Sequence, residues 1–563
     1  MRLELSVILL FTCVAPLWSQ EGAPASRQAE LPQQKCTIQG QVVKAGTGEP
    51  LKKARVMLSK AEGRDQQRVS VLTDPGGRFL LTEIEAGRYR LFVERNGYVR
   101  QEYGQRKFNR PGSLLTLAPG QGLRELVFRM VQAAVISGRV FDEDGEPVLQ
   151  GRVQAMRHTY VEGKRELLTA QTSTTNDLGE FRLFGLPPGR YYLSVSYVPG
   201  GSFVGMTTAP SVSPIGAEEG YAPSYYPGTS DPARAGALEL SPGEEVSRVD
   251  FRLVPTRAFR VRGRVFNSVT GEPGRGTNIW LMPRESGIRS WLIRNHTSVE
   301  DSQGAFEIHG ITPGSYTISA AWLNGDKQYS TAMPLDVSNA DVDGVSLVIA
   351  PGSDVSGRVQ IEGRTDFNLS NLHVWLQPRE EMMVIGGSAS ATVLRDGTFV
   401  LQNVAQETYR LYIWGMPPDF YLKAARLGAD DVLEGGINLT RAKGRPELEL
   451  VLSSAGARVD GLVLNEEHLP LSGAVVALVP EPSRRSQSRL YGSTNTDQYG
   501  RFTLRGIAPG EYKVFAWGDV ESGAYRDPEF LRPIEDAGVT VRLVEGAAQN
   551  VDLKLIPAKK PAS

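Results

Sequence analysis

The side chains that could perform metal or acid–base chemistry are few in this sequence, and their spacing does not suit a metallopeptidase. A catalytic zinc site needs three protein ligands, and in a zinc carboxypeptidase two of them form a His-x-x-Glu pair. Glu162 and Glu300 each follow a histidine by four residues instead of three. The chain has five histidines, which are His158, His296, His309, His373 and His468. We interpret all of them as surface residues.

Other catalytic signatures are missing from the sequence as well. It contains no Gly-x-Ser-x-Gly nucleophile turn, no phosphate-binding loop and no dinucleotide fingerprint. The sequence therefore predicts a protein that is not an enzyme, with no cofactor and no metal.

Two acidic turns could attract calcium, because clustered carboxylates suit a hard cation. One is Asp-Glu-Asp-Gly-Glu at residues 142–146, and the other is Asp-Val-Asp-Gly at residues 341–344. Neither turn supplies the bidentate glutamate that completes a twelve-residue calcium loop. Charged, solvated turns are therefore the favoured interpretation.

Aromatic side chains offer a different chemistry, which is the stacking of a ligand on exposed rings. Two segments with strand periodicity alternate core-facing residues with outward aromatic residues. The outward residues predicted to bind ligand are Phe515 and Trp517 in one segment and Tyr412 and Trp414 in the other. A loop rich in Tyr, Pro and Gly adds a second candidate surface, formed by Tyr221, Tyr225 and Tyr226.

Exposed aromatic rows stack sugar rings or peptides, and contiguous apolar surface often marks an interface. The alternative is that the segment following each strand, or a neighbouring part of the protein, covers these rings. Both interpretations remain open at this point.

The overall composition limits the classes of partner. The 62 Lys and Arg residues balance 63 Asp and Glu residues, which argues against nucleic acid and against a polybasic membrane contact. The 60 glycines and 35 prolines, with frequent Val, Thr, Tyr and Phe, are typical of a turn-rich β protein. A chain of 563 residues is also too long for a single core.

The N-terminus resembles an export signal. Arg2 precedes an apolar run from Leu5 to Leu17, and Ser19 supplies a small residue for cleavage, so residues 1–19 are predicted to be a Sec signal peptide. Lipid anchoring through Cys13 is a weaker alternative. After cleavage only Cys36 remains, which excludes an intrachain disulfide. No later segment is apolar enough to span a membrane. We expect an extracellular, periplasmic or cell-surface location.

One motif recurs five times along the chain, and in each copy a Tyr follows a Phe by ten residues. The pairs are Phe79/Tyr89, Phe181/Tyr191, Phe306/Tyr316, Phe399/Tyr409 and Phe502/Tyr512. A glycine within an apolar strand pattern precedes each Phe by 39 to 43 residues, namely Gly40, Gly138, Gly263, Gly357 and Gly461. The near-constant spacing indicates one unit repeated in tandem.

The repeats predict five β-sandwich domains, which we call units 1 to 5. After the signal peptide and a linker at 20–35, their expected ranges are 36–131, 134–255, 258–351, 353–454 and 456–557, followed by a tail at 558–563. Unit 2 carries a long insert rich in Tyr, Pro and Gly.

The motif in unit 5 illustrates why the distance between Phe and Tyr is the same in every copy. Asp497 and Gly500 favour a hairpin turn, and Phe502 and Tyr512 should lie on the core faces of the strands that follow. Pro-Gly-x-Tyr resembles the tyrosine corner of Greek-key sandwiches. Unit 1 has Ala86 in place of the proline and unit 4 has Gln-Glu-Thr at 406–408, so we expect a degraded corner there. All ten rings are predicted to be structural, and the fold to be an antiparallel, Ig-like or prealbumin-like Greek-key sandwich.

The repeated pattern resembles the carboxypeptidase regulatory-like domain. The residues that carry the resemblance in unit 5 are Gly461, Val463, Pro470, Leu471, Gly473, Ala474, Val476, Thr496, Asp497, Gly500, Phe502, Pro509, Gly510 and Tyr512. The resemblance implies a transthyretin-like, carbohydrate-binding-like β-sandwich found in exported bacterial proteins and related to adhesin B-type repeats. It implies no catalytic residues.

These observations predict an exported, non-enzymatic protein of five modules that binds carbohydrate or another cell-surface polymer. A structural spacer, a scaffold of the cell envelope or an adhesin-like stalk is the main alternative, in which contacts between units consume the aromatic residues. A third hypothesis, an accessory protein of a secreted peptidase, rests on the family resemblance alone. The expected partner is a polysaccharide or an envelope protein.

Overall fold

The computed structural model describes residues 34–61, 68–108, 110–197, 219–284, 295–325, 327–364, 366–378, 389–441 and 446–557. Strands dominate these ranges, and their one α-helix is α1, four residues long (Pro528–Leu531). The predicted all-β class is confirmed. The predicted signal peptide, including Cys13 and Ser19, and the tail at 558–563 lie outside the described residues.

The strands of units 1 to 3 follow one another in a common order. Unit 1 comprises β1 (Cys36–Lys44), β2 (Arg55–Lys60), β3 (Arg68–Leu72), β4 (Arg78–Ile84), β5 (Gly87–Glu94), β6 (Gln101–Glu102), β7 (Leu115–Leu117) and β8 (Gly122–Met130). Unit 2 comprises β9 (Ala134–Phe141), β10 (Arg152–Val161), β11 (Lys164–Thr174), β12 (Glu180–Leu186), β13 (Gly189–Ser196), β14 (Glu219–Tyr221), β15 (Ser224–Tyr225), η1 (Pro232–Arg234), β16 (Ala237–Leu240), β17 (Glu245–Val246) and β18 (Phe251–Arg252). Unit 3 comprises β20 (Phe259–Asn267), β21 (Glu272–Pro273), β22 (Asn278–Pro283), β23 (Asn295–Ser298), β24 (Ala305–Ile311), β25 (Gly314–Asn324), β26 (Lys327–Val337) and β27 (Val342–Ile349), and β19 (Pro255–Arg257) precedes it.

The last two units repeat this order with different insertions. Unit 4 comprises β28 (Ser353–Glu362), η2 (Leu369–Asn371), β29 (His373–Pro378), β30 (Ala389–Thr392), β31 (Thr398–Val404), β32 (Thr408–Trp414), β33 (Tyr421–Leu427), β34 (Asp430–Asp431), β35 (Ile437–Asn438), η3 (Leu439–Arg441) and β36 (Glu447–Ser453). Unit 5 comprises β37 (Ala457–Leu464), β38 (Val475–Pro480), η4 (Pro482–Arg484), η5 (Ser488–Leu490), β39 (Gly492–Asn495), β40 (Arg501–Ile507), β41 (Gly510–Trp517), η6 (Ala524–Arg526), α1, η7 (Arg532–Ala537), β42 (Val539–Leu543) and β43 (Ala548–Lys554).

Each unit is a sandwich of two sheets. In unit 5 the first sheet has the order β40-β37-β43 and the second has the order β39-β38-β41-β42. Strand β37 pairs antiparallel with β40 but parallel with the final strand, β43. A parallel pair between first and last strands recurs in every unit, as β1/β8, β9 with β17 and β18, β20/β27 and β28/β36. Among the named strands of the described residues, every other pairing within a unit is antiparallel, and unit 5 adds one isolated parallel bridge between Trp517 and Ile556.

The turn that opens the repeated motif joins the two sheets. In unit 5 it connects β39 of the second sheet to β40 of the first, so the prediction of a hairpin is wrong. Its local chemistry is as expected. The Asp497 Oδ1 atom accepts hydrogen bonds from the backbone N–H groups of Tyr499 (2.9 Å) and Arg501 (3.0 Å), and Gly500 has a φ of 74°.

The conserved glycine of the first strand lies opposite the motif phenylalanine. Gly461 is the direct antiparallel partner of Phe502. A Cβ atom on Gly461 would collide with the Val551 carbonyl oxygen of β43 and would lie 2.7 Å from the Phe502 ring, so a side chain there would displace both. The same pairing joins Gly40 to Phe79, Gly138 to Phe181, Gly263 to Phe306 and Gly357 to Phe399. In units 3 to 5 a side chain at this position would collide with the ring, and in all five units it would collide with a backbone carbonyl oxygen.

The motif tyrosine belongs to the opposite sheet and closes a corner in all five units. The phenol of Tyr512 donates to the Ala508 carbonyl at 2.8 Å. The equivalent distances are 2.9 Å for Tyr89, 2.8 Å for Tyr191, 2.7 Å for Tyr316 and 3.0 Å for Tyr409. The expectation of degraded corners in units 1 and 4 is wrong, because the acceptor is a backbone carbonyl that any residue supplies.

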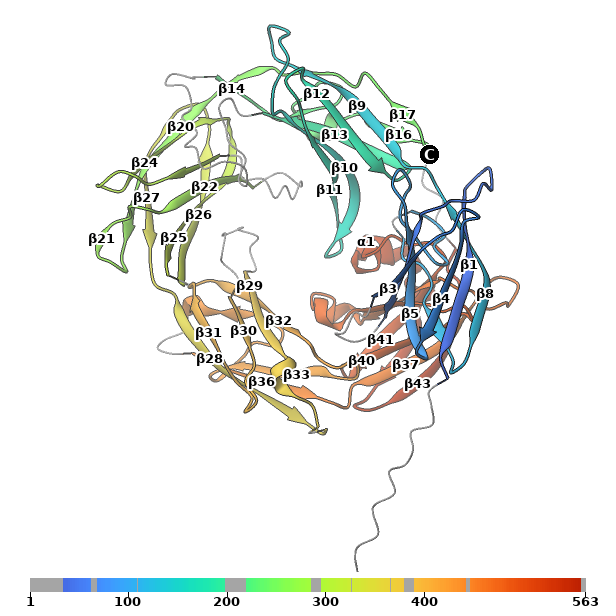
Figure 1. The fold of residues 1–563 in the computed structure, drawn as a ribbon. Coiled ribbons are helices and arrows are strands. Elements are labelled where there is room, and N and C mark those ends of the chain that lie inside the picture. The colour runs from blue at the N-terminus through green and yellow to red at the C-terminus, as the bar shows by residue number, and fades with distance from the viewer. Residues whose placement is uncertain are drawn as a thin grey trace, which may run out of the picture.

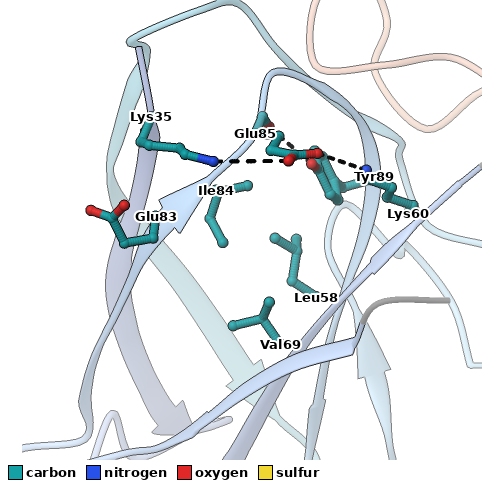
Figure 2. Close-up of a pocket in the computed structure, with 8 residues that line it drawn as sticks. All are labelled: Lys35, Leu58, Lys60, Val69, Glu83, Ile84, Glu85 and Tyr89. Carbon is teal, nitrogen blue, oxygen red and sulfur yellow. Dashed lines mark hydrogen bonds and ion pairs between the residues drawn. The ribbon is translucent and has the colours of Figure 1, made fainter. Parts of the chain in front are cut away.

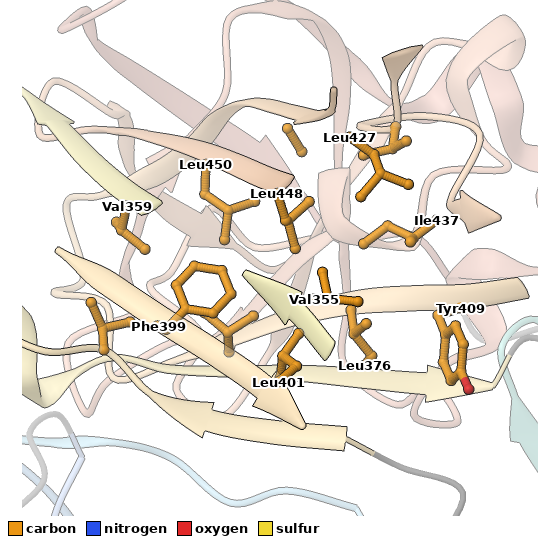
Figure 3. Packing of buried hydrophobic residues seen from close by; sticks show 14 of the residues in the cluster. Val355, Val359, Leu376, Phe399, Leu401, Tyr409, Leu427, Ile437, Leu448 and Leu450 are labelled. Atoms are coloured by element: carbon orange, nitrogen blue, oxygen red, sulfur yellow. The ribbon is translucent and has the colours of Figure 1, made fainter. Parts of the chain in front are cut away.

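The ten rings of these pairs are buried, and none is more than 6% exposed. Figure 3 shows unit 4, where Phe399 and Tyr409 lie among Val355, Leu376, Leu401 and other apolar side chains from both sheets. Among the described residues, five clusters of buried hydrophobic residues form the cores between the sheets, one in each predicted unit, and two smaller clusters lie in units 5 and 2. We propose on this basis that the predicted ranges are five domains.

The five units follow one another around a ring (Figure 1). Unit 1 thereby lies against unit 5. The backbone N–H of Thr116 donates to Gln498 Oε1 (2.9 Å), and Gln498 Nε2 donates back to the Thr116 carbonyl (2.6 Å). The Thr116 hydroxyl also donates to Asp497 Oδ2 at 3.0 Å. The opening turn of the unit 5 motif therefore also helps to close the ring.

Ion pairs complete this seam between the two ends of the chain. The Asp519 carboxylate of unit 5 lies 2.9 Å from Arg110 Nε and 2.5 Å from Lys107 Nζ of unit 1. Burial raises the pKa of the Asp519 carboxyl, but hydrogen bonds from Lys107 and Arg110 lower it by more, and the net pKa is below its ordinary value. The carboxylate is therefore charged at neutral pH.

Phe502→Ala should destabilise unit 5 by about 3–5 kcal/mol, because it removes a fully buried ring from between the sheets. Tyr512→Phe keeps the ring and loses one hydrogen bond, so it should cost only about 1 kcal/mol. Differential scanning calorimetry of the full chain measures both as a shift of one transition among several. Phe184→Ala, which removes a ring that is 62% exposed, is the control. A Phe502→Ala trace that matched the control would contradict the structural role.

Asp519→Lys should open the seam and increase the radius of gyration measured by small-angle X-ray scattering. In the wild type the charged Asp519 carboxylate stabilises the folded chain, since its folded pKa is lowered. This stabilisation is complete above the unfolded pKa of about 3.9 and is lost as the pH falls through the lower pKa of the folded state. Asp366→Lys makes the same charge change at a pair with neighbouring Arg364 and is the control. An unchanged radius of gyration in Asp519→Lys would refute this role of the seam.

Candidate ligand-binding site

Three aromatic rings form a row on the outer face of the second sheet of unit 4. Trp375 projects from β29, and Tyr412 and Trp414 project from β32. The ring centroids of Trp375 and Tyr412 are 5.4 Å apart, and those of Trp375 and Trp414 are 6.4 Å apart. Trp414 is 60% exposed and Trp375 is half-buried. We call these three residues the aromatic row.

Strand alternation positions the row. Val374 and Leu376 point into the core of unit 4, so Trp375 between them must face outward. Trp375 is the direct cross-strand partner of Tyr412. Sequence reasoning identified Tyr412 and Trp414 but missed Trp375, although its place between two apolar residues was a usable signal. The outward orientation expected for Tyr412 and Trp414 agrees with the structure.

Polar groups flank the row on both sides. His373 lies opposite Trp414, and its Nδ1 atom is 3.0 Å from the Thr392 hydroxyl. Arg410 continues the row on β32 and forms an ion pair with Glu162 of unit 2. The site therefore combines flat apolar faces with hydrogen-bonding groups at its ends.

The equivalent rings of unit 5 are covered. Phe515 is 0% exposed and Trp517 is 2% exposed, so neither can contact an external ligand in this conformation. The segment that follows β41 folds back over them. The Tyr525 ring is stacked on Trp517 at 6.5 Å, and the Phe530 ring lies 6.1 Å from it. In unit 5 the structure therefore agrees with the second interpretation, because the following segment covers Phe515 and Trp517. The prediction that these two rings bind a ligand is wrong for this conformation.

Charged groups fasten this covering segment to the sheet. The Glu535 carboxylate of η7 lies 2.7 Å from Arg485 and 3.3 Å from Lys513, which projects from the same strand as Trp517. Burial raises the pKa of Glu535, but the two basic partners lower it by more, so the pKa is below its ordinary value. The pairs are therefore intact at neutral pH.

The tyrosines of the unit 2 loop are mostly engaged within the protein. Tyr225 is only 5% exposed and is not available to a ligand. Tyr226 packs against Phe251 with a centroid distance of 6.3 Å. Tyr221 donates a hydrogen bond of 2.5 Å to Glu143, and burial together with this bond raises the pKa of its phenol. Tyr221 is half-buried.

The acidic turns have partners within the chain. Arg262 lies 3.4 Å from Asp341 and 3.1 Å from Asp343, and Asp142 accepts hydrogen bonds from the backbone of its own turn. Within the described ranges, no group of three or more His, Cys, Asp or Glu side chains could hold a metal ion.

A pocket of about 210 Å³ opens at the corner of unit 1 (Figure 2). Glu85 in its wall lies 2.8 Å from Lys60 and 3.8 Å from Lys35. Hydrogen bonding and charge from Lys60 lower the pKa of Glu85, so the carboxylate is ionised and its charge is balanced by Lys60. The Tyr89 phenol is used by its corner hydrogen bond. These contacts engage Glu85 and Tyr89 of the pocket wall within unit 1.

The two-sheet units, their corner tyrosines and the exposed aromatic row define a tandem β-sandwich protein. The family model described as "Carboxypeptidase regulatory-like domain" matches residues 37–131 and 135–212. The two matched segments lie in units 1 and 2, and they agree with the resemblance found in the sequence pattern. No curated protein sequence matches the chain. Among the described residues, no helix combines the length and apolar character needed to cross a membrane.

Several solved structures share local similarity with the chain. The TIE protein of Bacillus anthracis is 13% identical over 56% of this chain, with a TM-score of 0.15, and this chain spans only 51% of its length. A streptococcal ancillary pilin is 12% identical over 56% of this chain and all of its own (100%), with a TM-score of 0.19. BcpA, the major pilin subunit of Bacillus cereus, is 12% identical over 56% of this chain and 99% of its own, with a TM-score of 0.14. Scores this low support no inference about function.

Trp517→Ala and Trp414→Ala should differ strongly in their effects on stability. The first should cost about 3–5 kcal/mol, because it empties a buried site beneath the covering segment. The second should change stability by no more than about 0.5 kcal/mol, because the ring is largely in water. Thermal unfolding followed by circular dichroism measures both. Equal melting temperatures for the two variants would show that Trp517 is not buried as described.

Proposed function

We propose that this chain is an exported, non-catalytic binding protein that holds a carbohydrate or another cell-surface polymer on the aromatic row of unit 4. The observation that carries the proposal is the 60% exposure of Trp414 beside two further aromatic rings. Large exposed apolar groups in contact with one another commonly mark an interaction site.

The chemistry of the row supports a sugar-like ligand. Aromatic rings offer flat faces that pack against the apolar faces of sugar rings, and they lose little conformational entropy on binding. The His373 imidazole and the Thr392 hydroxyl at one end can exchange hydrogen bonds with ligand hydroxyl groups. The row lies on paired strands, which hold it in place before the ligand arrives.

A non-catalytic role is supported by the state of the ionisable groups. Glu85, Asp341 and Asp343 are each paired with a basic side chain. Export is proposed from the N-terminal sequence alone, with Arg2 and the apolar run that follows it.

A structural scaffold of the cell envelope is the second candidate, and the contacts between units favour it. Besides the seam between units 1 and 5, Glu545 of unit 5 contacts Tyr421 at 3.1 Å and Lys423 at 3.0 Å in unit 4. A scaffold would need these contacts and would not need the exposed row.

Retention of the full chain on insoluble polysaccharides separates the two candidates. We expect the wild type to be retained and Trp414→Ala to lose about tenfold or more in affinity, since ring stacking is worth about 1–3 kcal/mol. Phe184→Ala, which truncates a ring that is 62% exposed in unit 2, is the matched control and should bind like the wild type. Equal loss in both variants, or no retention on any polysaccharide, would reject the binding proposal and leave the scaffold.

A further inference from the structure

Arg410 extends the aromatic row by one outward position. Trp414, Tyr412 and Arg410 alternate along β32 with residues that face the core, so their side chains lie on the same side of the sheet. Two residues along a strand advance about 6.4–6.8 Å, so the three groups span roughly 13 Å. A ligand lying along the strand would meet two rings and then a guanidinium group.

A carboxylate already occupies the end of the row. Arg410 Nη1 donates to Glu162 Oε1 at 2.5 Å and to Glu162 Oε2 at 2.6 Å, although the two residues belong to different units. Burial lowers the pKa of the Arg410 guanidinium, but hydrogen bonds to Glu162 and Tyr412 raise it by more. Both side chains remain more than one-third exposed, at 37% and 38%. Solvent can reach this pair.

Glu162 lies at the tip of a long hairpin of unit 2. Strands β10 and β11 are joined by the two-residue turn Glu162–Gly163, in which both residues have positive φ values of 49° and 83°. Figure 1 shows the hairpin reaching inward from unit 2 toward α1 of unit 5. The sequence analysis considered Glu162 only as a residue that lies one position too far from His158 to form a His-x-x-Glu pair.

Other contacts hold the hairpin in place independently of Glu162. A Cβ atom on Gly163 would lie 2.6 Å from the Arg526 carbonyl oxygen, so the turn and unit 5 are in close contact. Tyr160 packs against the covering segment, 3.2 Å from a Cβ atom built on Gly523. Glu162 can therefore leave Arg410 while the tip of the hairpin stays docked.

We propose that the ligand of the aromatic row is an acidic polysaccharide, whose carboxylate replaces that of Glu162 on Arg410 while its sugar rings stack on Trp414 and Tyr412. This inference rests on the proposed function of the row. Glu162 acts as a tethered competitor, and a tethered group at high effective concentration lowers the apparent affinity for a free anion. Its presence shows that the end of the row accommodates a carboxylate.

The test is affinity electrophoresis of the full chain through gels that contain polygalacturonate or, in parallel, its fully methyl-esterified form. The wild type should be retarded more by the acidic polymer, and the difference should shrink as salt is added. Arg410→Gln should lose about tenfold in affinity for polygalacturonate, since a charge-assisted contact disappears. Glu162→Gln should gain affinity several-fold. Arg426→Gln, an exposed arginine on the other sheet of unit 4, is the control.

The opposite signs of these two effects separate a ligand site from a merely structural ion pair. If the Arg410–Glu162 pair only bridged the units, both variants would change binding in the same direction, and the inference would be overturned. Equal retardation by the esterified polymer would also overturn it, while the proposed function would stand. Retardation by poly-glutamate but not by polygalacturonate would replace the saccharide with an acidic peptide. No retardation by any polysaccharide would reject both proposals.

Discussion

One constraint underlies this structure: a glycine in the first strand pairs with a phenylalanine in the neighbouring strand, and a side chain on that glycine would collide with a backbone carbonyl near the end of the unit and, in units 3 to 5, with the phenylalanine ring. The tyrosine ten residues later enters the same core from the opposite sheet and anchors its own corner. The two rings fix how far apart the sheets lie and how the chain crosses between them. Because the constraint uses few residues, the remaining sequence of each unit is free to vary.

That freedom explains why five similar units present different outer faces. The core side of the second sheet is fixed by the tyrosine and its alternating neighbours, so the residues between them are available for other contacts. In unit 5 these positions hold Phe515 and Trp517 and are covered by the segment that contains α1. In unit 4 they hold Tyr412 and Trp414, and Trp414 faces solvent. The same backbone position thus serves internal packing in one unit and is exposed to solvent in another, where we propose that it meets a ligand.

Sequence alone predicted the strands, the buried ring pairs and the outward direction of Trp414, because these follow from alternation and turn chemistry. It did not predict that the turn at Asp497 joins two sheets, since a turn motif fixes local conformation but not the partners of its strands. Coverage of Trp517 by the following segment was one of two interpretations that the sequence left open, because residues 518–538 lack a periodic apolar pattern that would have decided between them. The contact between Thr116 and Gln498 joins residues 382 positions apart and leaves no local signal.

Hydrogen exchange of the full chain, read by mass spectrometry at peptide resolution, tests the central claim most directly. If each unit is held together at the glycine–phenylalanine pairing, peptides that contain the first strand and the phenylalanine strand should be the slowest to exchange in all five units. Peptides from the segment over Trp517 should exchange faster. Exchange of the first strands as rapid as that of the connecting turns would contradict the account.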